Sequence, residues 1–186
     1  MGDPQVIETA RLRLRPLTSA EADVLAWVEL HADPRVNTHL GAYTTEEAVA
    51  RLRHVERQWA ERGHGLFAVE LRADGSFLGR SGLQYWDQWD EVEAAWAYRF
   101  DAQGNGYATE AAEAFLAWGW RTLAVPTVTA MIVPENAASI RVAERLGFAP
   151  RRREQRFDHE VIVYELDRPA ADTADGAAEV TAVAPD

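Results

Sequence analysis

A short glycine-bearing segment at 103–107 has the residue types of a phosphate-binding turn. Gly104 and Gly106 lie between an expected strand at 92–100 and an expected helix at 109–123. Glycine allows backbone conformations that other residues avoid, and the first amides of a helix have no partner within it. Such a turn attracts anions. The segment therefore predicts a site for a phosphate-bearing ligand, although an ordinary strand-to-helix turn would have the same composition.

Two common phosphate loops do not fit this segment. A Walker A loop needs the sequence Gly-Lys-Ser/Thr, and this chain has no lysine, because all 19 basic residues are arginine. A dinucleotide-binding fingerprint needs a third glycine where Thr109 stands. A nucleotide- or dinucleotide-dependent enzyme is therefore disfavoured.

A second motif occupies residues 136–148, with the sequence Asn-Ala-Ala-Ser-Ile-Arg-Val-Ala-Glu-Arg-Leu-Gly-Phe. Asn136 is a good helix N-cap, and Gly147 is a good residue to follow a helix end. An apolar face is formed by Ile140, Val142, Ala143 and Leu146. Helix formation explains most of the motif. Asn136 and Ser139 remain as candidates for ligand contact, with capping an equal explanation for Asn136.

The two motifs together resemble the GNAT superfamily of N-acetyltransferases. In the pattern Gln/Arg-x-x-Gly-x-Gly/Ala, the fixed places are held by Gln103, Gly106 and Ala108. Residues 136–148 are similar to the Asn-x-x-Ser-x-Arg-x-x-Glu-Lys-x-Gly-Phe helix of the ribosomal-protein-alanine N-acetyltransferase-like branch, with Arg145 in place of Lys. Ala95 replaces the glycine usual in that branch. The resemblance covers roughly residues 7–166.

This resemblance implies that acetyl-CoA, or another acyl-CoA, is the acyl donor. The expected cofactor-binding residues are Tyr98, Arg99, Phe100, Gln103, Gly104, Asn105, Gly106, Tyr107, Ala108, Thr109, Asn136 and Ser139. It also implies direct attack of an amine on the thioester, with a backbone amide near residues 98–100 stabilising the tetrahedral oxyanion. No metal is expected, since the five histidines are scattered without ligand spacing.

Such a reaction needs a base for the amine. We expect Glu93 to be this base, because burial beside Trp89 or Trp96 would raise the pKa of its carboxyl. The acids at 87–93 would also attract a protonated amine, and Trp86 and Trp89 are expected to contact the acceptor together with Glu93. The alternative is that these acids solvate a hairpin loop.

The leaving thiolate needs an acid. Ser139 is expected to protonate it, directly or through water, with Tyr107 and Tyr164 as alternative acids. His159 is an alternative base. The arginines between 151 and 156 either form a solvated strand or meet an anionic acyl tail or the adenosine 3′-phosphate.

Hydrophobic patterns supply the elements that must position these residues. Strands are expected at 7–15, 65–71, 77–85, 92–100, 127–133, 151–157 and 161–166, and helices at 18–31, 45–63, 109–123 and 136–146. The order β-αα-βββ-α-β-α-ββ predicts an α/β (α+β) fold with a mixed sheet and helices on both faces. The resemblance makes this a GNAT-like, mostly antiparallel seven-stranded sheet, with a V-shaped gap between the strands at 92–100 and 127–133.

Composition limits the remaining possibilities. The 186 residues, 47% hydrophobic and 26% charged, predict one domain at 1–168, followed by a disordered acidic tail at 169–186. A net charge of -11 argues against a nucleic-acid partner. No apolar run has the length of a signal peptide or membrane span, and cysteine is absent, so a cytoplasmic protein without disulfides is expected.

The favoured function is therefore transfer of an acetyl or similar acyl group from acyl-CoA to an amine on a protein N-terminus or a small molecule. The alternative is a non-catalytic GNAT-fold protein that binds acyl-CoA or a partner, a possibility left open by Ala95. No membrane partner is expected. An exposed edge strand would permit a monomer or a homodimer.

Overall fold

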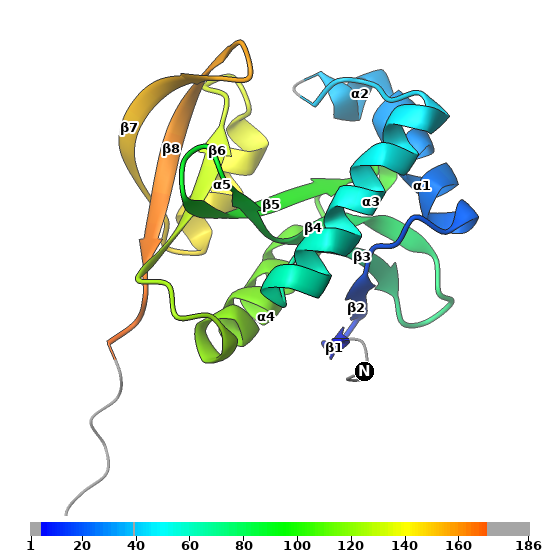
Figure 1. The fold of residues 1–186 in the computed structure, drawn as a ribbon, viewed down its shortest axis with the longest axis horizontal. Coiled ribbons are helices and arrows are strands. Elements are labelled where there is room, and N and C mark those ends of the chain that lie inside the picture. Colours follow the sequence, from blue (N-terminus) through cyan, green and yellow to red (C-terminus); the bar gives the residue numbers. More distant parts are fainter. Residues whose placement is uncertain (1–4, 39, 171–186) are drawn as a thin grey trace, which may run out of the picture.

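The apolar strand segments pair into one sheet in the computed structural model, which describes residues 5–38 and 40–170 (Figure 1). Its eight strands are β1 (Ile7–Glu8), β2 (Leu12–Pro16), β3 (Leu66–Leu71), β4 (Phe77–Trp86), β5 (Glu91–Tyr98), β6 (Thr127–Ile132), β7 (Ala149–Arg156) and β8 (His159–Asp167). They lie in the order β1-β2-β3-β4-β5-β6-β8-β7, and all neighbours are antiparallel except β5 and β6.

Helices cover both faces of this sheet, and β3 shows how its residues are divided between them. Leu66 and Ala68 face α1 (Glu21–Ala32) and α3 (Thr45–Arg62), where they join a core cluster with Trp27. The alternate residues Phe67 and Val69 pack on the other side with α4 (Tyr107–Thr122) and α5 (Ala137–Arg145). All four β3 residues are fully buried, as expected for a strand covered on both faces. The expected fold class is confirmed.

The number of strands is eight rather than the expected seven, because the first strand folds back on itself. At Thr9 the chain makes a tight turn in which the Thr9 amide donates to the Leu12 carbonyl at 2.9 Å. The Leu12 amide in turn donates to Thr9 Oγ1 at 2.9 Å. Ile7 then pairs with Leu14 in an antiparallel register. In one continuous strand Ile7 would face away from Leu12 and Leu14, and the reversal at Thr9 brings it opposite Leu14 instead.

A short helix, α2 (Pro34–Asn37), occupies the place where only a chain break was expected. Asp33 caps it by accepting a hydrogen bond from the Arg35 amide at 2.9 Å, and Pro34 has the fixed φ that suits the first helical position. The longer α3 begins with a capping box formed by Thr44 and Glu47. These caps fix α2, which borders the first cavity described below, and α3, which borders the second.

The parallel strands β5 and β6 diverge soon after they meet. They pair only at Glu93 and Thr129, whereas β4 pairs with β5 from Trp86 to Gly79. Beyond Glu93, the β6 edge of β5 therefore has no strand partner in the described structure. This is the V-shaped gap that the resemblance implied.

None of the helices in the described part of the chain combines the length and apolar content that a membrane crossing requires. The expected disordered tail lies, from residue 171 onward, outside the described residues. The remaining element is a short 3-10 helix, η1 (Phe100–Ala102), between β5 and the glycine turn.

Candidate active site

Two cavities meet where β5 and β6 diverge. The first, of about 620 Å³, lies between the glycine turn and the starts of α4 and α5. The second, of about 540 Å³, lies between α3 and the strands β4, β5 and β6. Both are lined by Leu40, Trp96, Asn136 and Ser139. A ligand in the first cavity thus has a route past Ser139 into the second.

The glycine turn presents unpaired amides to the first cavity. Gly104 and Gly106 have φ values of +77° and +79°, in the left-handed region that favours glycine. Gly106 is the N-cap of α4 and provides no side-chain cap. The amide of Glu110 is the one that bonds back to the Gly106 carbonyl, at 3.0 Å. The three amides before it, at residues 107–109, lie at the cavity wall with the positive end of the helix dipole.

Two polar side chains of this turn hold its shape. Gln103 Nε2 donates to the Tyr98 carbonyl at 3.1 Å, and Asn105 Nδ2 donates to the Ala102 carbonyl at 3.2 Å. From β1–β2, Arg11 bonds the Asn105 carbonyl at 3.0 Å and forms an ion pair with Glu110 at 2.6 Å. Gln103 borders the cavity, but Asn105 does not. Asn105 therefore supports the turn rather than the ligand.

Two further residues of the expected cofactor set lie outside the lining of the first cavity. Arg99 forms an ion pair with Asp101 at 2.9 Å. Phe100 lies under the guanidinium of Arg35 at 4.1 Å. The rest of the set, namely Tyr98, Gln103, Gly104, Gly106, Tyr107, Ala108, Thr109, Asn136 and Ser139, borders this cavity.

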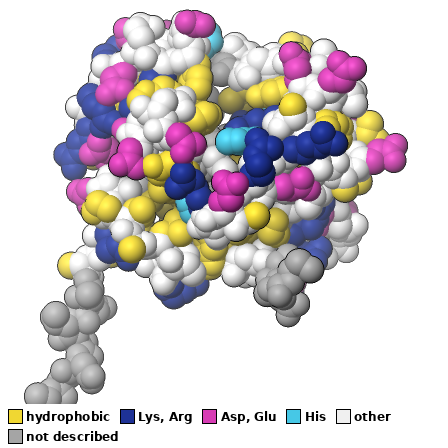
Figure 2. Space-filling model, viewed as in Figure 1, with side chains coloured by type: hydrophobic (Ala, Val, Ile, Leu, Met, Phe, Trp, Pro, Cys, Tyr) yellow, Lys and Arg dark blue, Asp and Glu magenta, His cyan; other side chains and the backbone are white. Residues whose placement is uncertain are grey.

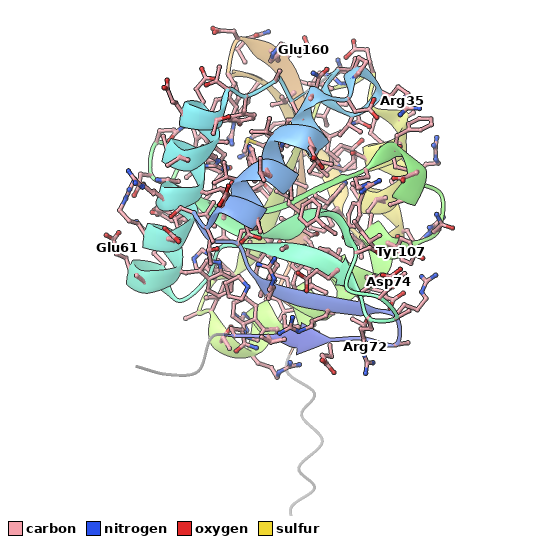
Figure 3. All side chains as sticks on the ribbon, turned by 90° about the vertical axis from the view of Figure 1, so that its right-hand side faces the viewer. Arg35, Glu61, Arg72, Asp74, Tyr107 and Glu160 are labelled. Atoms are coloured by element: carbon pink, nitrogen blue, oxygen red, sulfur yellow. The ribbon has the colours of Figure 1, made fainter. Side chains whose placement is uncertain are left out.

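Sequence reasoning missed three arginines that line the first cavity: Arg35 from α2, with Arg141 and Arg145 from α5. Arg35 and Tyr107 lie on the same side of the molecule (Figure 3). Arg141 and Arg145 are four residues apart, so they share one helix face. That spacing was visible in the sequence, but nothing in it showed that this face borders a cavity.

The carboxylate of Glu93 is buried at the wall of the second cavity, with 7% of the residue exposed. Its Oε2 accepts hydrogen bonds from Gln84 Nε2 at 2.7 Å and Trp86 Nε1 at 2.6 Å. Its Oε1 has a longer contact with the Met131 amide, at 3.4 Å. Burial raises the pKa of Glu93, and these hydrogen bonds oppose the rise. The hydrogen-bonding tryptophan is thus Trp86, whereas we had expected Trp89 or Trp96 beside this carboxyl.

The other acids of the 87–93 stretch point elsewhere. Asp87 pairs with Arg62 at 2.8 Å, and Asp90 accepts a hydrogen bond from Tyr85. Glu91 forms ion pairs with arginines of β7. Of the acids in this stretch, only Glu93 lines the second cavity, and the ion pairs and hydrogen bonds of the others agree with the alternative of a solvated loop.

Of the two tryptophans expected to contact the acceptor, Trp86 lines the second cavity and Trp89 does not. Trp89 packs behind it, against Phe157 and under the guanidinium of Arg156 at 4.2 Å. The arginines between 151 and 156 form ion pairs with neighbouring acids, and basic and acidic side chains lie side by side over β7 (Figure 2). Arg151, Arg152 and Arg153 lie outside both cavities and match the solvated-strand alternative, whereas Arg156 is buried and lines the second cavity.

Ser139 lies where the two cavities join, at the start of α5. Its hydroxyl accepts a hydrogen bond from Trp96 Nε1 at 3.2 Å, which leaves its own proton free to be donated. The amide of Ser139 donates to Asn136 Oδ1 at 3.0 Å, so Asn136 is an N-cap that also borders both cavities.

The alternative acids and base have different positions. Tyr107 lines the first cavity, but Tyr164 is buried, paired with Ala130 of β6 and Pro150 of β7, and borders neither cavity. Burial also raises the pKa of Tyr164, which makes it a poorer acid. His159 is exposed at the rim of the second cavity.

The β5 amides that face the gap follow from strand geometry. The Arg99 amide donates to the Leu78 carbonyl of β4 at 2.9 Å and is therefore unavailable to a ligand. Because successive amides of a strand point in opposite directions, those of Tyr98 and Trp96 point toward the β6 side. The oxyanion donor was expected within residues 98–100. In that range the Tyr98 amide is still a candidate, and the Trp96 amide is a second candidate outside it.

No group of three or more His, Cys, Asp or Glu side chains that could hold a metal ion occurs among the residues the structure describes.

Comparisons with known proteins agree with this architecture. The family model for an acetyltransferase (GNAT) domain matches residues 11–149. YkkB of Bacillus subtilis (strain 168) is 30% identical over 167 residues, covering 84% of this chain and 92% of its own. The N-acetyltransferase YnaD of the same organism is 30% identical over 143 residues, covering 76% of this chain and 81% of its own.

Solved structures are similar over nearly the whole described chain. An acetyltransferase from Agrobacterium tumefaciens str. C58 has a TM-score of 0.76 and 32% identity, covering 89% of this chain and 96% of its own. RimL, a ribosomal L7/L12 alpha-N-protein acetyltransferase solved with coenzyme A, has a TM-score of 0.72 and 15% identity, covering 88% of this chain and 98% of its own. At that identity the likeness to RimL shows the fold alone.

Proposed function

We propose, from the premise that this chain belongs to the GNAT acetyltransferase family, that it transfers an acetyl group from acetyl-CoA to an amine. One observation carries the proposal: the glycine turn opens onto a cavity that continues past Ser139 to the buried carboxylate of Glu93. The phosphate site is thus followed by a path for the pantetheine arm of coenzyme A and then by a base, which is the order that acyl transfer needs.

The first cavity suits coenzyme A. The pyrophosphate would lie on the amides at residues 107–109, where a helix start favours anions. Arg35, Arg141 and Arg145 line the same cavity against the single acid Glu135, although the chain as a whole carries a charge of -11. The pantetheine arm would run along the unpaired edge of β5. RimL shares this fold and was solved with coenzyme A, which supports this placement.

The second cavity suits the acceptor. Glu93 would take the proton of the attacking amine, and its Oε1 is the oxygen with the weaker existing contact. As the amine nitrogen bonds to the thioester carbon, the amide of Tyr98 or Trp96 would stabilise the oxyanion. The carbon–sulfur bond then breaks, and Ser139 would pass a proton from a solvent water to the thiolate, so that its hydroxyl is restored while Trp96 holds its oxygen.

Calorimetric titration with acetyl-CoA tests the cofactor assignment. We expect saturable binding, and an absence of binding up to millimolar concentration would overturn the assignment. Release of free CoA with a panel of amines then tests turnover. Losing the base should reduce kcat/KM for Glu93→Gln by roughly 10²–10⁴-fold, with a smaller loss for Ser139→Ala.

The same assay separates the enzyme from a non-catalytic binder. A protein that binds acetyl-CoA but releases no CoA with any amine would support the binding role. Full activity in both variants would show that the base and acid assignments are wrong while leaving the cofactor assignment intact. Ala95 packs in the core with α1 and α3 and also lines the second cavity.

A further inference from the structure

One wall of the second cavity is basic. Arg80 on β4 and Arg51 on α3 both line it. Arg80 is 8% exposed, its Nε has no hydrogen-bond partner, and its side chain makes no ion pair among the residues the structure describes. Its guanidinium lies over the Trp27 ring at 5.3 Å, but a buried guanidinium without an acidic partner is still costly, because burial removes hydration that an ion pair would replace.

The buried Arg156 and the half-buried Arg15 have acidic partners. Arg156, which is 3% exposed, pairs with Glu91 and Glu154, each at 2.7 Å. Arg15 pairs with Asp23 at 2.7 Å. Arg80 departs from this pattern. Burial lowers the pKa of Arg80 to about 10, so it remains charged at neutral pH.

Gln84 keeps the arginines and the base apart. Its Oε1 accepts a hydrogen bond from Arg51, and its Nε2 donates to Glu93 at 2.7 Å. A neutral amide therefore stands between guanidinium and carboxylate, and neither Arg51 nor Arg80 forms an ion pair with Glu93. The second cavity thus keeps a separate positive end, since Arg156, which also lines it, is already neutralised.

We propose that the acceptor is a small molecule in which the amine is accompanied by an oxyanion, such as the carboxylate of an amino acid, bound by Arg80 and Arg51. This rests on the proposed function of the site. Guanidinium groups bind carboxylates and phosphonates through paired, charge-assisted hydrogen bonds. Arg80 is four residues from Gln84 along β4, about 13 Å at strand spacing, and the side chains reach inward from both positions. The cavity of about 540 Å³ is of small-molecule size.

The test compares acceptors that differ only in the anion. Each standard amino acid is assayed with its α-amide and its aminoalkylphosphonate, at saturating acetyl-CoA. We expect kcat/KM for the best acid or phosphonate to exceed that of the matching amide by roughly tenfold to a hundredfold, as for a hydrogen bond to a charged group. Arg80→Met and Arg51→Gln should remove this preference, measured as the ratio of kcat/KM for the acid to kcat/KM for the amide, while Arg53→Gln, on the exposed face of α3, should retain it.

Two further measurements do not depend on turnover. Calorimetry with N-acetyl amino acids and their amides should show the same preference in the wild-type protein and its loss in Arg80→Met. Without ligand, Arg80→Met should melt at the same or a higher temperature, because a buried unpaired charge has been removed. A lower melting temperature would instead mark Arg80 as structural.

The inference is overturned if amides are used or bound as well as acids, or if the variants lose both classes equally. It is also overturned if acidic peptides are preferred and free amino acids are not. Absence of acetyl-CoA binding would overturn the proposed function instead, and the N-acetyl ligands would still test the arginines.

Discussion

Glu93 is the residue whose ionisation should control the pH dependence of catalysis. A base acts in its deprotonated form, so kcat/KM should fall as the pH falls through the pKa of Glu93. Because burial raises that pKa, the fall should begin above the ordinary range for glutamate. Glu93→Gln should lower kcat/KM and abolish this acidic limb. The measurement is a pH profile with one acceptor, so that ionisation of the amine cancels between variants.

The exposed Asp90 provides the matched control for this experiment. Asp90→Asn removes a carboxylate from the same loop, and we expect it to keep the acidic limb. An unchanged limb in Glu93→Gln would assign the ionisation to another group, with His159 at the cavity rim the first to examine.

The acids at 87–93 show how far the role of a residue can be predicted from its type. The acids at 87–93 are alike as residue types, and only their tertiary partners distinguish them. Asp87 meets Arg62 from α3, and Glu91 meets arginines of β7, which lies 60 residues further on. Residue type and family resemblance selected Glu93, but neither could show that Trp86 rather than Trp89 would reach its carboxylate. The unpaired Arg80 was likewise invisible, because every arginine in the sequence has the same type.

At the level of elements, the turn before α4 should depend on Gly106. Its φ of +79° makes any side chain costly, and Gly106→Ala should destabilise the protein by about 1–2 kcal/mol. A turn that relaxes from this strain would also move the amides at 107–109. We therefore expect acetyl-CoA affinity, measured by calorimetry, to fall at least about tenfold, which corresponds to about 1.4 kcal/mol.

Gly75→Ala is the control for that strain. Gly75 has a φ of +76° and lies in the β3–β4 turn, where a Cβ added to it would have nothing within 4 Å. It should lose a similar amount of stability in urea unfolding and keep its affinity for acetyl-CoA. Equal losses of affinity in both variants would mean that the effect is one of general stability.

Turns and caps that depend on residues close in the sequence could be predicted. Features that depend on contacts between residues far apart in the sequence were harder to predict. The turn at 103–107 and the Asn136 cap depend on local geometry, and both are found where the motifs indicated. The lining of the two cavities depends instead on where β5 and β6 diverge, which is directly after the single pairing of Glu93 with Thr129. Only the family resemblance implied this gap. The turn at Thr9 was missed although Ile7 is out of phase with Leu12 and Leu14, because one residue out of phase is a weak signal in so short a segment.

For the whole molecule, charge is distributed unevenly. The chain has 30 acids against 19 arginines, yet arginines line both cavities. Asp87 and Glu91 of the 87–93 stretch pair with arginines of α3 and β7. Among the cavity arginines, Arg35 and Arg156 have acidic partners, whereas Arg51, Arg80, Arg141 and Arg145 form no ion pair among the described residues. The net charge therefore argued against a nucleic-acid partner, but it did not describe the charge of the cavity walls that a ligand would contact.

Acid stability of the whole fold should depend on His31, which is fully buried under α3 and beside the second cavity's basic wall. Its ring stacks on Trp27 at 4.5 Å, its Nδ1 lies 2.8 Å from the Trp27 carbonyl, and Tyr43 packs edge-on at 4.9 Å. Burial, with a smaller contribution from the positive charge of Arg80, lowers the pKa of His31 from 6.5 to about 4.

The sign of the effect follows from proton uptake. Between pH 6.5 and 4 the unfolded chain binds a proton at His31 and the folded chain does not, so stability is lost as the pH falls through this window. The loss is on the order of 3 kcal/mol across the window. His31→Phe keeps the stacking on Trp27 and removes the titration, so its unfolding free energy in urea should change less between pH 7 and pH 4. His159→Gln, at an exposed position, should behave like the wild type, and a His31→Phe curve parallel to the wild type would show that other groups govern acid unfolding.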